Sequence, residues 1–194
     1  MHVNSEDPMV RAAAILRSPR PNMRRYIDHL QQAAGSGNAT AQENLAAWFL
    51  EGLRDRRGWI LKRSPRKAVG LLTDAVKGGN SLAIFSLANC YAEGVGVRVD
   101  RKRARALYTQ AYRRGVGLAA MNLSLLCAED ADRRGELSWL KRAAAVGEDD
   151  AVVEVARRSR GALSHDLVKA LRRIATKGPT DLRADARAML RRLR

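Results

Sequence analysis

The sequence is poor in aromatic residues, with two Phe, four Tyr and three Trp in a chain of 194 residues. Sheet sandwiches and barrels rely on aromatic and β-branched side chains, so this scarcity disfavours both. No apolar run approaches the roughly 18 residues of a membrane-spanning helix, and the first residues lack the order of a signal peptide. We therefore expect no membrane span and a cytoplasmic location.

Cysteine and histidine are also scarce, and neither occurs in a pattern typical of catalysis. Cys90 and Cys127 fall in apolar helical stretches, which favours buried, reduced thiols over a disulfide framework. The three histidines have no Cys, His or carboxylate neighbours at metal-ligand spacing. The glycines at 94–97 follow a predicted helix and precede no Gly-Lys-Ser/Thr, which favours a turn over a phosphate-binding loop. The sequence predicts no enzyme, catalytic residue, metal, cofactor or small-molecule substrate.

A repeat is present, marked by glycines spaced by roughly 31 to 42 residues. These anchor glycines are Gly37, Gly79, Gly115, Gly147 and Gly178. An apolar stripe at helical spacing follows each of the first four, which predicts a helix A at 37–52, 79–94, 115–130 and 147–161. A second helix, helix B, is predicted to end at each anchor, covering 23–37, 65–79, 103–115, 136–147 and 167–178. A left-handed cap is expected at each anchor.

Helices that start near Pro8 and Pro179 complete the pattern and bring the expected number to eleven or twelve. The turns between helix A and helix B carry their own start signals. Asp100 is placed to cap the helix B that follows it, and Ser64 with Pro65 is expected to supply a cap and a first helical residue. Cores of Ala and Leu at these spacings predict helices that approach closely.

The unit from Ala83 to Gly115 resembles the Sel1-like repeat, a relative of the tetratricopeptide repeat. The matching positions are Ala83, Leu87, Tyr91, Gly94, Gly96, Val97, Asp100, Arg103, Ala104, Tyr108, Ala111 and Gly115. The preceding unit keeps Ala41, Leu45, Gly52, Lys67, Ala68 and Ala75, but residues 53–65 replace the short glycine turn. The later units lack that turn altogether.

This resemblance implies an all-α fold, a right-handed α–α solenoid of Sel1-like, TPR-like helix pairs. It also implies a non-catalytic adaptor that holds other proteins. We expect one domain over 1–194, with an N-terminal tail and capping helix at 1–20, repeats at 21–178 and a C-terminal capping helix at 179–194.

Positive charge is concentrated in the connections from helix A to helix B. The formal net charge is +16, from 36 Lys and Arg against 20 Asp and Glu. The two connections richest in cations contain Arg54, Arg56, Arg57, Lys62, Arg63, Arg66, Lys67, Arg98, Arg101, Lys102, Arg103 and Arg105. The other connections contain Arg17, Arg20, Arg24, Arg25, Arg133, Arg134, Arg157, Arg158 and Arg160. Because these turns share one edge of a solenoid, the cations are expected to form a basic ribbon.

Two interpretations of this charge remain open. Arginine is common throughout the chain, so the ribbon can reflect coding bias and solvated loops. Against this, cations in the first turn of a helix face its positive dipole end, at a cost of about 0.3 to 1 kcal/mol each, which a partner would offset. The triplet from Trp59 to Leu61 has two interpretations as well: it folds back over helix A, or Trp59 is an interface hot spot.

The leading hypothesis is a scaffold that binds an acidic protein or peptide through this edge and the concave helical face. The partner-binding residues are predicted to be Arg54, Arg56, Arg57, Trp59, Lys62, Arg63, Arg66, Lys67, Arg98, Arg101, Lys102 and Arg103. The alternative is non-specific nucleic-acid binding, for which a charge of +16 suffices. Only Trp59 is placed for base stacking, which weakens this alternative.

Overall fold

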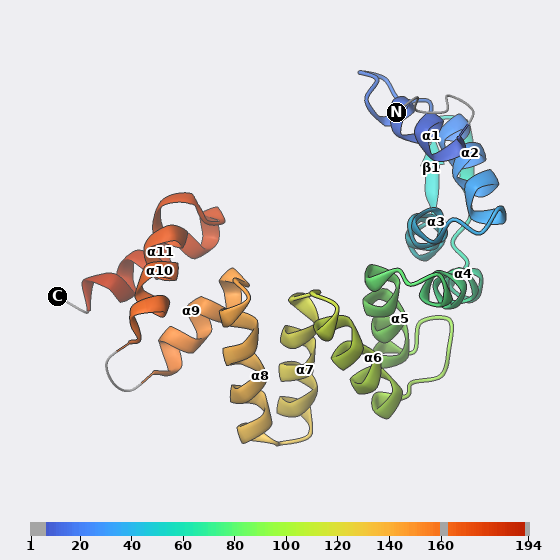
Figure 1. The fold of residues 1–194 in the computed structure, drawn as a ribbon. Coiled ribbons are helices and arrows are strands. Elements are labelled where there is room, and N and C mark those ends of the chain that lie inside the picture. The colour runs from blue at the N-terminus through green and yellow to red at the C-terminus, as the bar shows by residue number, and fades with distance from the viewer. Residues whose placement is uncertain (1–6, 160–162, 193–194) are drawn as a thin grey trace. The chain divides into compact units, whose positions relative to one another are not determined.

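A computed structural model describes residues 7–159 and 163–192. Within these residues the chain forms eleven helices and one two-stranded sheet (Figure 1). The helices are α1 (Pro8–Leu16), α2 (Met23–Gly35), α3 (Ala39–Glu51), α4 (Pro65–Lys77), α5 (Ser81–Glu93), α6 (Arg101–Arg113), α7 (Leu118–Glu129), α8 (Arg133–Ala145), α9 (Asp149–Arg158), α10 (His165–Lys177) and α11 (Thr180–Arg191). The strands are β1 (Leu53–Asp55) and β2 (Gly58–Leu61).

The helices match the predicted repeat. The predicted helices A are α3, α5, α7 and α9, and the predicted helices B are α2, α4, α6, α8 and α10. The terminal helices α1 and α11 start at or next to the two predicted prolines. The equivalent alanines of helices A, Ala41, Ala83, Ala119 and Ala151, are all fully buried. The spacing of Ala and Gly therefore predicted both the positions and the buried faces of these helices.

The chain divides into two compact units, residues 1–107 and 108–194, with the division inside α6. In the first unit each of α1 to α4 packs against the helix that follows it, around cores that include Leu30 and Leu72. In the second unit α7, α8 and α9 pack in succession, and α9, α10 and α11 enclose a core around Val152 and Ile174. Packing between neighbours in sequence is characteristic of α–α solenoids. A single domain over 1–194 stays a prediction.

Four of the five anchor glycines adopt the predicted left-handed backbone. Gly37, Gly79, Gly115 and Gly147 have φ values between +84° and +95°. The prediction was wrong for Gly178, whose φ is −71° and ψ 177°. Gly178 precedes a proline, and the proline ring forces the preceding residue into an extended conformation.

The helix starts show one prediction confirmed and one corrected. The Asp100 carboxylate accepts a hydrogen bond of 2.9 Å from the Arg103 amide, as expected for an N-cap. Ser64 precedes α4 with Pro65 in the first turn, but its hydroxyl makes no capping hydrogen bond. The Ser64 amide instead donates to the Phe49 carbonyl at 2.7 Å, and the Ser64 φ of −151° differs from the −67° of the true cap Asn38.

Two alanine substitutions check this difference. Asp100→Ala is expected to lower the free energy of unfolding by about 1 kcal/mol, because it removes the acceptor of an otherwise unpaired helix amide. Ser64→Ala is expected to lower the free energy of unfolding by only a few tenths of the loss in Asp100→Ala, because no capping hydrogen bond is removed. Urea unfolding of the two variants measures both values. Equal losses would contradict the assignment of the caps.

The inserted residues form a β-hairpin, which the sequence analysis did not predict. The strands β1 and β2 are antiparallel, with Arg54 opposite Trp59 and Asp55 opposite Gly58. The turn is stabilised by Asp55, whose carboxylate accepts a 2.7 Å hydrogen bond from the Arg57 amide, and by Gly58 at φ +114°. The rest of the described chain follows the predicted helical pattern.

The hairpin places the three residues of the apolar triplet, Trp59 to Leu61, in different environments. Ile60 packs against the core of α1, α2 and α3, and Leu61 is buried with 7% of its surface exposed. Trp59 remains 47% exposed. Folding back therefore describes Ile60 and Leu61, and the interpretation of Trp59 as an interface hot spot stays a prediction.

Candidate functional site

The twelve predicted partner-binding residues all lie in the first unit and are all exposed. They occupy the hairpin and the first turn of α4, and the α5–α6 turn with the first turn of α6. The two connections touch at Gly96. A Cβ at Gly96 would lie 2.5 Å from the Pro65 carbonyl oxygen and 3.1 Å from the Arg66 amide nitrogen. We call the surface formed by the twelve residues on these two connections the basic edge.

Two cations of the basic edge lie over aromatic rings. The Lys67 ammonium is 5.6 Å from the centre of the Phe49 ring, and the Arg103 guanidinium is 4.4 Å from that of Tyr91. Lys67 and Arg103 occupy equivalent repeat positions, as do Phe49 and Tyr91. This cation–π contact offsets the cost of a cation in the first helical turn. These two cations therefore need no external partner to account for their positions.

Two further arginines have internal roles. The Arg54 guanidinium lies 4.9 Å from the centre of the Trp59 ring on the opposite strand. The Arg63 Nε donates a 2.8 Å hydrogen bond to the Leu50 carbonyl in the last turn of α3. A cation at this end of a helix is favourable because the helix carbonyls carry partial negative charge there.

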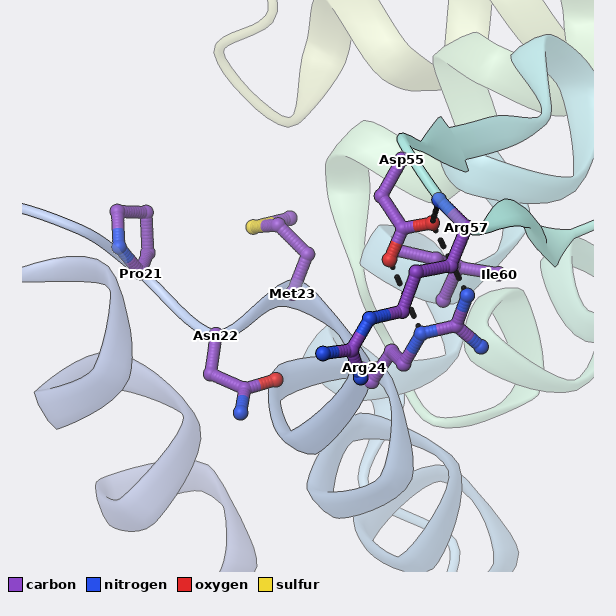
Figure 2. Close-up of a pocket in the computed structure, with 7 residues that line it drawn as sticks. All are labelled: Pro21, Asn22, Met23, Arg24, Asp55, Arg57 and Ile60. Atoms are coloured by element: carbon purple, nitrogen blue, oxygen red, sulfur yellow. Dashed lines mark hydrogen bonds and ion pairs between the residues drawn. The ribbon is translucent and has the colours of Figure 1, made fainter.

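An ion pair joins the hairpin turn to α2. Arg24 donates two hydrogen bonds of 3.0 Å to the Asp55 carboxylate, and the Arg57 amide donates a third (Figure 2). The hydrogen bond from Arg24 is the largest cause of the lowered pKa of the Asp55 carboxyl, and the charge of Arg57 adds to it. A small hollow of about 300 Å³ lies beside this pair. Asp55 thus neutralises charge at one end of the basic edge.

Five cations of the basic edge have no such partner. In the described ranges 7–159 and 163–192, no hydrogen bond, ion pair or ring contact engages the side chain of Arg56, Lys62, Arg66, Arg98 or Lys102. Arg66 and Lys102 occupy equivalent positions in successive repeats. We call these five residues the unpaired cations.

The sequence analysis missed one exposed apolar residue that adjoins the basic edge. Val99, between Arg98 and Asp100, is 58% exposed. Like Trp59, it is an exposed apolar residue close to cations. An apolar residue within a charged turn is a signal that could have identified it.

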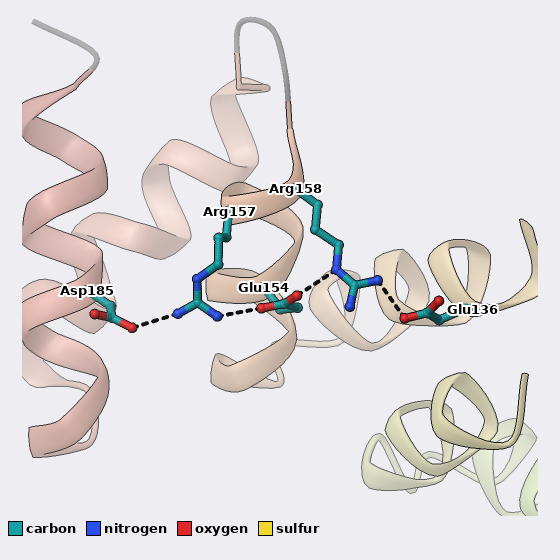
Figure 3. A network of polar contacts seen from close by, with 5 residues as sticks. All are labelled: Glu136, Glu154, Arg157, Arg158 and Asp185. Atoms are coloured by element: carbon teal, nitrogen blue, oxygen red, sulfur yellow. Dashed lines mark hydrogen bonds and ion pairs between the residues drawn. The ribbon is translucent and has the colours of Figure 1, made fainter. Parts of the chain in front are cut away.

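In the second unit two of the corresponding arginines, Arg157 and Arg158, are neutralised. Arg157 pairs with Glu154 at 2.6 Å and Asp185 at 2.8 Å, and Arg158 pairs with Glu136 and Glu154 at 2.6 Å (Figure 3). The hydrogen bonds with Glu136 and Glu154 raise the pKa of Arg158. These contacts tie α9 to α8 and α11.

Of the other predicted cations here, Arg133 and Arg134 are exposed, and Arg160 lies outside the described residues. The strongest candidate for a charged interaction surface is therefore the basic edge of the first unit.

The second unit contains an open groove of about 830 Å³, which the sequence analysis did not predict. It lies among α8, α9 and α10 and is lined by apolar side chains, including Val155 and Leu167. Arg173 lies at the groove and is already paired with Asp149. The groove has a volume typical of ligand sites. Its lining also includes Lys141 and Asp166, whose opposite charges give no single sign that would indicate a ligand.

Both thiols are buried, and no metal-binding cluster occurs in the described part of the chain. Cys90 and Cys127 are buried, as predicted, and form no disulfide with each other. Burial raises the pKa of the Cys90 thiol, which disfavours the reactive thiolate. Within those same residues no three His, Cys, Asp or Glu side chains are grouped to hold a metal ion, and no helix has the length and apolarity to cross a bilayer.

The fold and this edge define a helical-repeat protein of the α–α solenoid class, as predicted. The Sel1 repeat profile matches the chain twice, at residues 39–80 and 81–116. These matches coincide with the units that carry the basic edge. The chain therefore contains two Sel1 repeats.

Comparison with curated proteins gives one short match. The chain is 41% identical to the alginate biosynthesis protein AlgK of Azotobacter vinelandii over 66 residues, which is 34% of this chain and 14% of that protein. The chain thus matches only a small part of this relative.

Solved structures resemble the chain over most of its length. A Sel1 repeat protein from Oxalobacter formigenes has a TM-score of 0.72 at 23% identity, and the match covers 93% of this chain and 54% of that protein's chain. A protective antigen of uropathogenic Escherichia coli with an SLR fold has a TM-score of 0.68 at 19% identity, covering 96% and 41%. An immunity protein from Pseudomonas aeruginosa has a TM-score of 0.54 at 20% identity, covering 84% and 61%. The chain spans less than two thirds of each of these proteins, and the likeness concerns the fold alone.

Proposed function

We propose that this protein is a non-catalytic scaffold that binds an acidic protein or peptide through the basic edge. Sel1-repeat proteins generally mediate protein–protein interactions. The observation that carries the finer proposal is the set of unpaired cations on two touching connections. Cations held close together without counter-charges repel one another, and an acidic partner relieves this repulsion.

Nucleic-acid binding is the weaker candidate. Proteins that bind single strands without sequence preference combine cations with several aromatic platforms. In the described chain Trp59 is the one exposed aromatic side chain. Positive charge is the one feature that supports nucleic-acid binding, and it supports binding of an acidic protein equally well.

The proposal is tested with a labelled peptide rich in glutamate. Its fluorescence anisotropy is expected to rise on titration with the protein, and the affinity is expected to fall as salt screens the exposed charges. A peptide of the same length with glutamine in place of glutamate is expected not to bind. Equal binding of both peptides would contradict the proposal.

Removing the internal counter-charge is expected to strengthen this binding. Asp55→Asn removes the carboxylate that neutralises Arg24 and lies beside Arg57, and should raise the affinity for the glutamate peptide by about threefold at low salt. The matched control is Asp74→Asn, because Asp74 also forms an exposed ion pair, with Lys77, but at the other end of α4. An unchanged or weaker affinity in Asp55→Asn would place binding away from the hairpin.

A further inference from the structure

Each connection of the basic edge holds one exposed apolar side chain among cations. Trp59 is 47% exposed and lies in the hairpin, whose turn contains the unpaired Arg56 and whose second strand directly precedes the unpaired Lys62. Val99 is 58% exposed and directly follows the unpaired Arg98. The same combination therefore occurs in two successive repeats.

A glycine at the end of helix A supports each of these side chains. A Cβ at Gly52 would lie 3.0 Å from Cζ3 of the Trp59 ring, and a Cβ at Gly94 would lie 2.8 Å from Cγ2 of Val99. Gly52 and Gly94 occupy the same repeat position, and both have positive φ, +81° and +74°. The chain thus packs an exposed apolar group against the helix end in both repeats.

The aromatic ring is also fixed by its neighbours. Arg54 lies 4.9 Å from the ring centre, across the strand pair. A preorganised side chain loses little conformational entropy when a partner covers it, so it contributes more to affinity than a mobile one. Trp is also the residue type most enriched at interface hot spots.

We infer that the ligand of the basic edge is an acidic peptide segment that also carries apolar side chains. Its carboxylates pair with the unpaired cations, and its apolar groups cover Trp59 and Val99. This inference rests on the proposed function and narrows it, because a bare polyanion would satisfy the cations but leave both apolar groups exposed. Contact between the connections at Gly96 and Pro65 allows one segment to reach both.

The test uses three probes of equal charge: a peptide that alternates Glu with Leu, one that alternates Glu with Ser, and a single-stranded oligonucleotide. At about 150 mM salt, where exposed charges are screened beyond about 8 Å, the Glu–Leu peptide is expected to bind at least about tenfold more tightly than the others. Trp59→Ala and Val99→Ser are each expected to reduce this preference. Leu125→Ser is the control, since Leu125 is 59% exposed in the second unit.

The outcomes separate the inference from the proposed function. Binding of the Glu–Ser peptide or the oligonucleotide as tight as that of the Glu–Leu peptide overturns the inference and leaves the basic edge an anion site. If charge reversal of Arg66 and Lys102 leaves peptide binding unchanged, the proposed function itself is overturned. Acrylamide quenching of tryptophan fluorescence in the unaltered protein gives a second measurement. The Glu–Leu peptide is expected to shield Trp59 and the Glu–Ser peptide is not, whereas equal shielding overturns the inference.

Discussion

Replacing both Arg66 and Lys102 by Glu is expected to weaken binding of the glutamate-rich peptide by about tenfold to a hundredfold at low salt. Both side chains lie in the first turn of a helix B, and neither has a counter-charge in the described residues. Reversal changes the local charge by four and creates repulsion where a partner carboxylate would lie. Fluorescence anisotropy with the labelled peptide measures the change.

The control is charge reversal in the second unit. Lys169→Glu with Arg172→Glu makes the same change in net charge on exposed positions of α10. This variant is expected to bind the peptide within about twofold of the unaltered protein, since only long-range electrostatics change. Equal weakening in the two double variants would mean that net charge, rather than the basic edge, determines binding.

Gly96→Ala is expected to lower the free energy of unfolding by about 2 to 5 kcal/mol. A left-handed φ of +78° costs an alanine roughly 1 to 2 kcal/mol, and the added methyl group would overlap the Pro65 carbonyl, at about 1 to 3 kcal/mol more. Pro65 cannot move away easily, because it is in the first turn of α4. Urea unfolding measures the loss.

Gly37→Ala separates the two contributions. Gly37 has a similar φ of +87°, but a Cβ there meets no atom within 4 Å. Its loss should be only the backbone part, about 1 to 2 kcal/mol. If Gly96→Ala costs no more than Gly37→Ala, the two connections do not touch as described.

The helices were predictable from the sequence because their packing repeats. Small residues at Ala41, Ala83 and Ala119 recur at one helical position, and only close helix packing explains a conserved spacing of this kind within one chain. The hairpin was not predictable in the same way, because its strands are short and occur in a single unit. Its signals were local: Asp55 two residues before an arginine, Gly58, and the apolar triplet.

The candidate site was only partly predictable. The exposure of the twelve residues follows from their position in connections. Their different roles depend on tertiary contacts: Lys67 and Arg103 lie over rings from the preceding helix, and Arg157 pairs with residues of two helices. The equivalence of Phe49 with Tyr91 was visible in the repeat alignment and could have indicated the ring contacts.

Turns without glycine limited the prediction in the second unit. Ala131 adopts a φ of +57° in the α7–α8 turn, and Asp132 caps α8 through a 2.9 Å hydrogen bond from the Gly135 amide. The Asp132 cap signal was present in the sequence, but a left-handed alanine has no sequence signature. Such a turn is recognised only from its neighbouring helices.

Amide chemical shifts during titration with the glutamate-rich peptide test the central claim most directly. The account predicts that the largest shifts occur at residues 54–67 and 96–103, while the groove lined by Val155 and Leu167 and the network around Arg158 change little. Largest shifts in the groove or around Arg158, with residues 54–67 and 96–103 unaffected, would contradict the assignment of the basic edge as the binding surface.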